Sequence, residues 1–429
     1  MKKALIISYY YPPCTGVASF RPLSWSRDFI KHGIKPTIVT RHWNGRENSW
    51  EDYLAENDKP IDIFDEGTSK IIRLPYKKNK IIQKIETPWI IKSGISRITH
   101  FLLNFRGKFQ REVDAEGCFK DFLVQYLSKE KYSLLIVTAP PLNIVSLGYY
   151  LHQRFHIPFV VDFRDSWNNL LLKTGYRPNN REALQNKMKE YYLGKWLQAA
   201  CFTTTVTPAI AELISKLGIH NTEIITNGFQ LEDYKIKIEK ENTNTFIVSV
   251  IGTIHPYQDI ESMLEGTKLF LSDKNPGEVL FQFIGISASP EIESQVKQSL
   301  PEEFIITTQR VTKEEAIRQT LLSDILLFPS YKGFSNYYTA KIFEYLGSGK
   351  NILMVPGNHD MVDDLILTTG AGKIAYNSIQ FSNHLNGWFS EWKSTGNLKY
   401  NGVPEKINFY SRENQTRILC QNILNRLKT

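Results

Sequence analysis

Three polar residues near position 340, Thr339, Lys341 and Glu344, have types and spacing suited to binding a phosphorylated ligand. The surrounding sequence predicts a helix that begins near Thr339, where unpaired N–H groups and the positive end of the helix dipole attract phosphate. Thr339 can cap this helix or hydrogen-bond an anion, and Lys341 adds a cation in the first turn. Glu344 lies too deep to cap, so its carboxylate can instead accept hydrogen bonds from two vicinal hydroxyls, as on a ribose.

The elements that must position these residues are two apolar strands and the helix between them. Residues 323–330, SDILLFPS, predict a strand that stops at Pro329. The helix after the loop carries four apolar residues at helical spacing, Ile342, Phe343, Tyr345 and Leu346. Residues 351–355, NILMV, are wholly apolar, which is the pattern of a parallel strand covered on both faces. Lys341 and Glu344 would be ordinary solvated charges on a surface helix, but these flanking strands favour a binding role.

A second candidate group, Asp162, Arg164 and Asp165, follows the apolar run IPFVV. The carboxyl ends of parallel strands meet at one edge of a sheet, where open α/β sheets bind their ligands. Three charges at such a strand end would be costly if the strand were purely structural. The alternative is that these residues cap the next helix, and that alternative is strongest for Asp165.

Two glycine-containing loops are predicted at the same kind of position. Gly16 follows the first strand of the chain, and Gly252 with Thr253 follows the strand that opens the second half. A glycine at a strand end lets a ligand or another segment approach the backbone closely. An ordinary turn glycine explains a single such residue about equally well.

The composition is that of a globular protein of two domains. The chain has 429 residues, of which 42% are hydrophobic and 22% charged. Its four cysteines are scattered, without a C-x-x-C pair, which argues against a zinc site or a disulfide framework and fits a reducing cytoplasm. The apolar core of the first residues is too short for a signal peptide, and no apolar run is long enough for a transmembrane helix.

The net charge of +8 is concentrated in one segment. Residues 43–65 are polar and predict an irregular excursion, and residues 70–111 then contain eleven Lys or Arg against one glutamate. Bulky apolar residues alternate with these cations, which favours a helix lying on an anionic membrane. The alternatives are a nucleic-acid site, for which no motif is present, and a solvated surface helix. The predicted membrane or acceptor contacts are Lys77, Lys78, Lys80, Lys84, Trp89, Lys92 and Arg97.

Strand and helix patterns alternate along the chain and restart once, which predicts two doubly wound α/β domains. We expect an N-terminal domain at 1–240, carrying the basic insert 70–111, and a second domain at 241–406. The polar segment 235–245 is the candidate linker. The remaining residues, 407–429, predict an amphipathic helix.

Four stretches of this chain resemble glycosyltransferase family 4. They are YYYPPCTGVASFRP at 9–22, VVDFRDSW at 160–167, TNGF at 226–229 and TAKIFEYLGSGKNIL at 339–353. Each is weak alone, but the four occur in the order and spacing of the family, and the resemblance covers nearly the whole chain. It implies the GT-B architecture, two Rossmann-like domains facing across a cleft, with the terminal helix crossing back to the first domain. The resemblance also implies that domain 1–240 binds the acceptor and that domain 241–406 binds the nucleotide sugar.

The resemblance also implies roles for individual residues. The helix start holds the diphosphate of a nucleotide-sugar donor, and Glu344 grips the ribose. The donor-binding residues implied are Gly16, Gly252, Thr253, Tyr337, Tyr338, Thr339, Ala340, Lys341 and Glu344. On the acceptor side, Asp162 or Asp165 orients the acceptor hydroxyl, a choice that the sequence leaves open, and Arg164 pairs with a phosphate.

The chain departs from the family pattern at Thr15, where a first glycine is common, and in two further places. Asn336 stands where many members have a second glutamate, eight residues before Glu344. The loop IHPYQD, after Gly252, lacks the arginine and lysine that usually neutralise the diphosphate, and His255 is the candidate substitute there. Asp360, with the two aspartates that follow it at 363 and 364, predicts the opening of a helix more simply than a metal site.

These features predict a glycosyltransferase that moves a sugar from a nucleotide-diphosphate sugar, its co-substrate, to an acceptor hydroxyl. No cofactor is expected, and no metal is required because the chain has no DxD pair. The resemblance implies retention at the anomeric carbon. The basic insert favours a lipid-linked acceptor in surface-polysaccharide or glycan assembly, with the protein peripheral at the cytoplasmic face of the plasma membrane. The alternatives are a non-hydrolysing nucleotide-sugar epimerase and a degenerate, non-catalytic scaffold.

Overall fold

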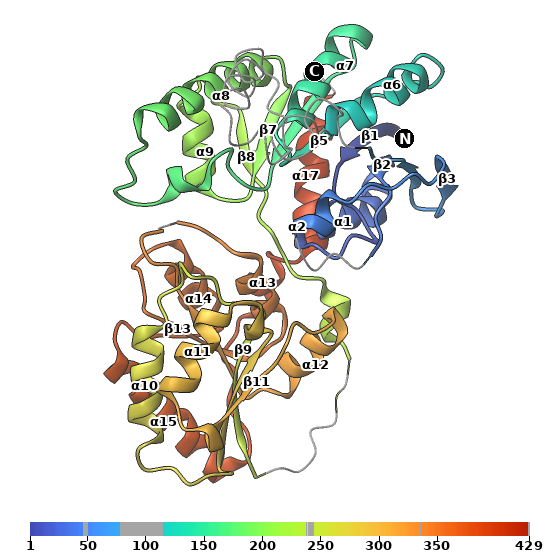
Figure 1. Ribbon diagram of the computed structural model, residues 1–429. Helices are drawn as coiled ribbons and strands as arrows, with labels where there is room; N and C mark the ends of the chain where they lie inside the picture. Colours follow the sequence, from blue (N-terminus) through green and yellow to red (C-terminus); the bar gives the residue numbers. More distant parts are fainter. Residues whose placement is uncertain (46–49, 78–114, 237, 239–243, 335, 428–429) are drawn as a thin grey trace. The chain divides into compact units, whose positions relative to one another are not determined.

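The computed structural model describes residues 1–45, 50–77, 115–236, 238, 244–334 and 336–427 (Figure 1). The chain divides into two compact units. Unit 1 comprises residues 1–226 and 415–429, and unit 2 comprises residues 227–414. Each unit is a largely parallel sheet covered by helices on both faces, so the predicted α/β class with two Rossmann-like units is confirmed.

Unit 1 contains an eight-stranded sheet in the order β3-β4-β2-β1-β5-β6-β7-β8. The strands are β1 (Lys2–Ser8), β2 (Ile34–Arg41), β3 (Asp62–Asp65), β4 (Lys70–Leu74), β5 (Leu134–Ala139), β6 (Phe159–Phe163), β7 (Phe202–Thr205) and β8 (Thr222–Ile224). The helices are η1 (Val17–Ser19), α1 (Phe20–Asp28), η2 (Phe29–His32), α2 (Trp50–Leu54), α6 (Ala115–Leu127), α7 (Asn143–Phe155), η3 (Asn169–Leu172), α8 (Asn180–Gln198), α9 (Pro208–Ser215) and α17 (Arg412–Arg426), of which α17 begins in unit 2. The sheet is parallel apart from β3, which pairs antiparallel with β4.

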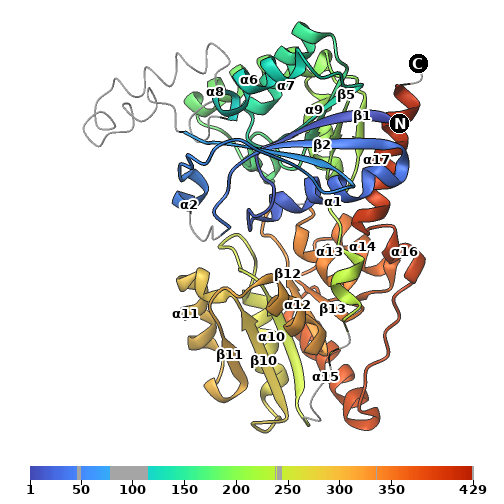
Figure 2. The same cartoon turned by 90° about the vertical axis from the view of Figure 1, so that its right-hand side faces the viewer.

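The central strands of unit 1 are apolar throughout because both faces of the sheet are covered. In β1, Leu5 and Ile7 pack in the cluster formed with α6, α7, α8 and α9, whereas Ala4 and Ile6 pack in the cluster formed with α1 and α17. Successive side chains of a strand point to opposite faces, so a two-sided core needs a continuous apolar run. Figure 2 shows α1 and α17 on the side of the sheet opposite to α6 and α7.

The predictions for residues 43–65 and for the start of the basic insert were wrong in part. Residues 43–65 include helix α2 and strand β3, and Lys70–Leu74 form strand β4 beside β2. Within β4, Ile71, Ile72 and Leu74 are buried. These apolar residues fill the sheet core, while Lys70 and Arg73 of the same strand remain partly exposed. The two charges explain why the sequence did not predict a strand here.

Unit 2 contains a six-stranded, wholly parallel sheet in the order β11-β10-β9-β12-β13-β14. The strands are β9 (Phe246–Ile251), β10 (Val279–Ile284), β11 (Ile305–Thr307), β12 (Ile325–Pro329), β13 (Asn351–Val355) and β14 (Gly372–Ile374). The helices are η4 (Leu231–Tyr234), α10 (Glu261–Leu271), η5 (Ile286–Ala288), α11 (Pro290–Ser299), η6 (Glu302–Phe304), α12 (Lys313–Leu322), α13 (Ala340–Gly347), α14 (Met361–Thr369), α15 (Ser378–Thr395) and α16 (Pro404–Asn408).

Two apolar clusters lie on the two faces of the unit 2 sheet. Helices α10, α11 and α15 contribute to one cluster, and α13 and α14 contribute to the other. Figure 1 shows α10 and α15 together on one flank of the sheet. All five residues of β12 and of β13 are buried, as predicted for parallel strands covered on both sides.

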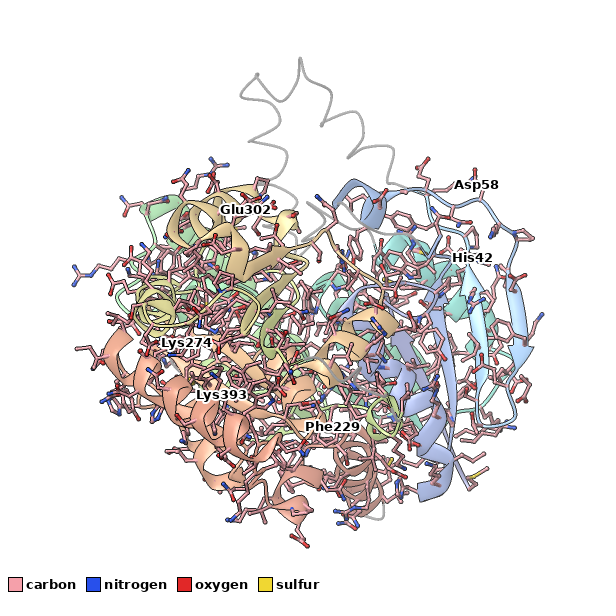
Figure 3. All side chains as sticks on the ribbon, turned by 90° about the horizontal axis from the view of Figure 1, so that it is seen from below. His42, Asp58, Phe229, Lys274, Glu302 and Lys393 are labelled. Atoms are coloured by element: carbon pink, nitrogen blue, oxygen red, sulfur yellow. The ribbon has the colours of Figure 1, made fainter. Side chains whose placement is uncertain are left out.

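The boundary between the two units differs from the predicted one at residue 240. Residues 227–234 belong to unit 2 because Phe229, labelled in Figure 3, is 1% exposed and lies in the apolar cluster of α13. The Phe229 N–H donates to the carbonyl of Tyr410, and the Arg412 N–H donates to the carbonyl of Phe229. At the other end, the segment grouped with unit 1 begins at Gln415 and not at 407. Much of the predicted linker 235–245 lies outside the described residues.

Candidate functional site

Helix α13 begins at the carboxyl edge of the unit 2 sheet, as the sequence predicted. Thr339 occupies the N-cap position with extended backbone, yet its side chain makes no capping hydrogen bond. Its Oγ1 atom is buried and has no hydrogen-bond partner among the described residues. An unsatisfied hydroxyl at a helix start, next to the unpaired N–H groups of the first turn, forms a site suited to an anion.

The position of α13 is fixed by its apolar residues, which pack in the cluster on one face of the unit 2 sheet. Ile342, Phe343, Tyr345 and Leu346 are all buried. The Tyr345 hydroxyl also accepts a hydrogen bond of 2.8 Å from the backbone N–H of Ile251, the last residue of β9. This hydrogen bond attaches the second half of α13 to the end of β9.

Lys341 and the loop after β9 come together in the structure. The Lys341 Nζ donates to the carbonyl oxygens of Thr253 at 3.1 Å and Gly252 at 3.5 Å. Burial lowers the pKa of the lysine to about 8. Partial desolvation of His255, and then the Lys341 charge, lower the pKa of the imidazole. Near neutral pH this loop therefore presents one buried ammonium group, which an anion would stabilise.

Two glycines allow the strand ends at this site to approach each other. Gly252 has φ +86° and Gly285 has φ +85°, a backbone conformation that favours glycine. A β-carbon on Gly285 would lie 3.6 Å from the Cα of Gly252. Gly285, at the end of β10, was not among the predicted site residues, although a glycine directly after an apolar strand was an available signal.

Glu344 lies one turn further along α13, and protein groups already bind its carboxylate. The Tyr234 hydroxyl donates to Oε2 at 2.7 Å, and Arg412 Nη2 donates to Oε1 at 3.0 Å. Burial, and then the Glu344 charge, raise the pKa of Tyr234. Neither Tyr234 nor Arg412 was predicted as a site residue.

The tyrosines before α13 differ in their surroundings. Tyr338 is only 8% exposed, packs against Phe343 with ring centres 5.2 Å apart, and donates a long hydrogen bond of 3.4 Å to the carbonyl of Met361. It therefore supports the turn from below. Tyr337 and Ala340 are half-buried beside the helix start.

Asn336 and Asp360 hold the outer part of the same loop. The Asn336 N–H donates to Asp360 Oδ2 at 2.9 Å, and Asp360 Oδ1 caps α14 by accepting from the N–H of Val362. The predicted role of Asp360 at a helix start is thereby confirmed. In the part of the chain that the structure describes, no group of three or more His, Cys, Asp or Glu side chains is arranged to hold a metal ion.

In unit 1, the structure separates the two candidate aspartates. Asp162 is 1% exposed, and its carboxylate accepts hydrogen bonds from Arg21, Thr138 and Thr204 at 2.6–3.1 Å. Arg21 also donates to the carbonyl of Thr226 at 2.9 Å. With its acceptor positions occupied inside the protein, Asp162 is placed to fix the end of β6 and not to meet a substrate.

Asp165 and Arg164 lie three and two residues further along the same loop. Burial raises the pKa of Asp165, and the neighbouring Arg164 partly offsets this rise. Arg164 donates to the Pro140 carbonyl and lies 5.2 Å from the centre of the Tyr10 ring. Its Nε atom is buried and has no hydrogen-bond partner within the described residues. Within the segment 162–165, Asp165 and Arg164 are therefore the charged side chains that can still bind a ligand.

Gly16, a predicted donor-binding residue, lies against a side chain of its own unit. A β-carbon at this position would lie 2.8 Å from the hydroxyl oxygen of Tyr53. The close approach that the glycine permits is therefore made by Tyr53 of helix α2, a residue of the same unit.

The predicted membrane contacts fall almost entirely outside the described residues. Only Lys77 of that set is described, and it forms an exposed ion pair with Asp58 at 3.2 Å. Lys78, Lys80, Lys84, Trp89, Lys92 and Arg97 lie outside the described residues. Among the helices of the described segments, none has the length and apolarity needed to span a bilayer.

Comparison with solved structures shows similarity over the whole length of the chain. The sucrose-phosphate synthase of Thermosynechococcus elongatus is similar with a TM-score of 0.65 at 12% identity, covering 100% of this chain and 99% of that chain. The Anabaena protein HepE in complex with UDP and glucose gives 0.61 at 11% identity, covering 99% and 100%. An α,α-trehalose-phosphate synthase (UDP-forming) from Burkholderia vietnamiensis gives 0.59 at 10% identity, covering 100% of each chain.

Comparisons by sequence give no relative. No protein-family model matches the chain, and no curated protein matches it. At identities of 10–12% the structural similarity establishes the fold alone. The chain therefore has the fold of the GT-B glycosyltransferases, built of two Rossmann-like units.

Proposed function

We propose that the protein is a glycosyltransferase that moves a sugar from a nucleotide-diphosphate sugar to an acceptor hydroxyl. The observation that carries this proposal is the start of α13, which combines the unpartnered Thr339 hydroxyl, the N–H groups of the first turn and the partly buried Lys341 ammonium within three residues. A similar fold binds UDP and glucose in HepE, which supports a nucleotide-sugar ligand.

The chemistry required is stabilisation of the leaving diphosphate. When the glycosidic bond to the donor breaks, negative charge grows on the terminal phosphate. Preorganised N–H groups and a desolvated ammonium stabilise such charge more strongly than water does, because they need no reorientation during the reaction. Lys341 and the first turn of α13 supply these groups, and Glu344 receives the ribose hydroxyls.

On the acceptor side, Asp165 is the preferred candidate for orienting the nucleophilic hydroxyl. It is half-buried, and its raised pKa indicates a carboxylate that can take up a proton more readily than a solvated one. The Nε atom of Arg164 offers a donor to an anionic group of either substrate.

The finer features of this function rest on the sequence. The basic insert 70–111 supports a lipid-linked acceptor at the cytoplasmic face of an anionic membrane, in surface-polysaccharide or glycan assembly. The resemblance to glycosyltransferase family 4 supports retention at the anomeric carbon, with no metal required.

The test is release of nucleoside diphosphate from UDP-, GDP- and ADP-sugars by the full chain in the presence of membrane lipid extract. We expect release from one donor, a sugar attached to a lipid product, and loss of both on Glu344→Ala. Mass spectrometry and sugar analysis of a reaction without lipid provide the control. An epimerised sugar there would assign the protein as an epimerase, and a complete lack of turnover would support a non-catalytic scaffold.

A further inference from the structure

The Glu344 carboxylate is held by side chains from two distant stretches of unit 2. Tyr234 belongs to η4 and Arg412 is the first residue of α17, whereas Glu344 lies on α13. Each carboxylate oxygen accepts one hydrogen bond from these partners, at 2.7 Å on Oε2 and 3.0 Å on Oε1. The carboxylate is therefore fixed at both oxygens.

The remaining capacity of this carboxylate matches a diol. An ionised carboxylate offers about four acceptor positions. The two protein donors leave one position on each oxygen, and the Glu344 side chain is 26% exposed, so a ligand can reach it. Two vicinal hydroxyls supply two donors at neighbouring positions, one for each oxygen.

Both protein groups act as donors to the Glu344 carboxylate. The pKa of Tyr234 is raised, chiefly by burial, so its hydroxyl remains protonated and remains a donor to Oε2. Arg412 is a permanent cation and its side chain is only 8% exposed. Each of the two groups is therefore a donor to the carboxylate and leaves its remaining acceptor positions to a ligand.

The two donors both contact one buried residue, Phe229. The Arg412 N–H donates to the carbonyl of Phe229 at 2.9 Å, and the Tyr234 ring lies edge-on to Phe229 with centres 6.5 Å apart. Phe229 packs so closely on α13 that a β-carbon at Gly347 would lie 2.5 Å from its ring. Tyr234, Arg412 and the helix carrying Glu344 thus share a common support.

We propose that Tyr234 and Arg412 are positioning residues for donor binding. They hold the Glu344 carboxylate in one orientation and leave one acceptor position on each oxygen for the two hydroxyls of a nucleotide ribose. This inference rests on the proposed function, because it takes the ligand to be a nucleoside diphosphate.

The test compares the affinity of the full-length protein for a ribonucleotide and for its 2′-deoxy form. UDP, GDP and ADP, each with its 2′-deoxy counterpart, are titrated by calorimetry. For the nucleotide that binds, we expect the deoxy form to bind roughly tenfold more weakly, as for loss of a hydrogen bond to a charged group. Tyr234→Phe should reduce that ratio at least about threefold, and Arg412→Lys, which keeps the charge, should have a smaller effect.

Tyr400→Phe is the matched control. The Tyr400 side chain packs beside the same apolar cluster, but its hydroxyl has no hydrogen-bond partner among the described residues. This variant should keep the wild-type ratio. A purely structural role of Tyr234 would weaken both nucleotides equally, leave their ratio unchanged, and overturn the positioning role.

Two further outcomes separate this inference from the proposed function. If the wild-type protein binds a ribonucleotide and its deoxy form equally, the diol contact is wrong but nucleotide binding stands. If no nucleoside diphosphate binds at all, the inference and the proposed function both fail.

Discussion

The affinity for nucleoside diphosphate should fall as pH rises through the pKa of Lys341. Burial lowers that pKa to about 8 in the unliganded protein. The lysine is then about 90% protonated at pH 7 and about 10% protonated at pH 9. If only the ammonium form binds the diphosphate tightly, the dissociation constant rises about tenfold over this interval, which is about 1.4 kcal/mol.

Two other titratable groups near the site, His255 and Tyr331, keep one protonation state in this window. The pKa of His255 is lowered, so the imidazole is already neutral at pH 7. Burial raises the pKa of Tyr331 to about 12, so it remains protonated at pH 9. A terminal phosphate has its second pKa near 6 and carries a constant charge above pH 7.

Calorimetric titration at half-unit steps from pH 7 to pH 9 measures this effect. We expect the wild-type affinity to decrease across the interval and Lys341→Met to bind weakly with no such slope. A flat wild-type profile, or an equal slope in the Lys341→Met variant, would refute the assignment of Lys341 as the phosphate-binding cation.

Three further predictions concern unit 1. Arg21→Met leaves the buried Asp162 carboxylate without its main partner, and should lower the free energy of unfolding by about 3–5 kcal/mol in urea titration; a loss below about 1 kcal/mol would show that the pair is dispensable. Asp165→Asn should lower kcat at least about tenfold with little change in Tm, whereas Asp162→Asn should lower Tm; the reverse pattern would exchange the roles of the two aspartates. Replacing Lys78, Lys80 and Lys84 by glutamate should weaken the free energy of binding to vesicles containing phosphatidylserine by at least about 1 kcal/mol per lysine, as measured by sedimentation. Equal binding of the wild type to neutral vesicles would contradict the membrane role.

The sequence predicted well where local pattern determines structure. The run NILMV became a buried parallel strand because a strand covered on two faces must be apolar on both. Helix α13 begins and ends near its predicted residues because its bounds are set by nearby sequence, namely the apolar residues at helical spacing and the glycines that follow them. The same locality placed Lys341 and Glu344 correctly on their helix.

Long-range partners could not be predicted in this way. Tyr234 lies 110 residues from Glu344, and Arg412 lies 68 residues from it. Arg21 lies 141 residues from Asp162, and its hydrogen bonds to that carboxylate distinguish Asp162 from Asp165. No local pattern encodes these pairs, because they arise only when the sheet order brings the strand ends together.

Two other differences between sequence and structure have a physical cause. Strand β4 was read as part of a basic helix because two cations alternate with its buried isoleucines and leucine. The close approach of Tyr53 to Gly16 could not be predicted from the sequence, because the two residues lie on separate elements.

The central claim is that the start of α13 binds a nucleoside diphosphate. Thermal unfolding of the full chain with UDP, GDP, ADP and their sugars tests it most directly, because a ligand that binds only the folded state raises Tm. We expect one nucleotide series to raise Tm by several degrees, with the rise reduced in Lys341→Met and Glu344→Ala. If no member of the panel raises Tm at millimolar concentration, or if the variants respond as the wild type does, the claim is contradicted.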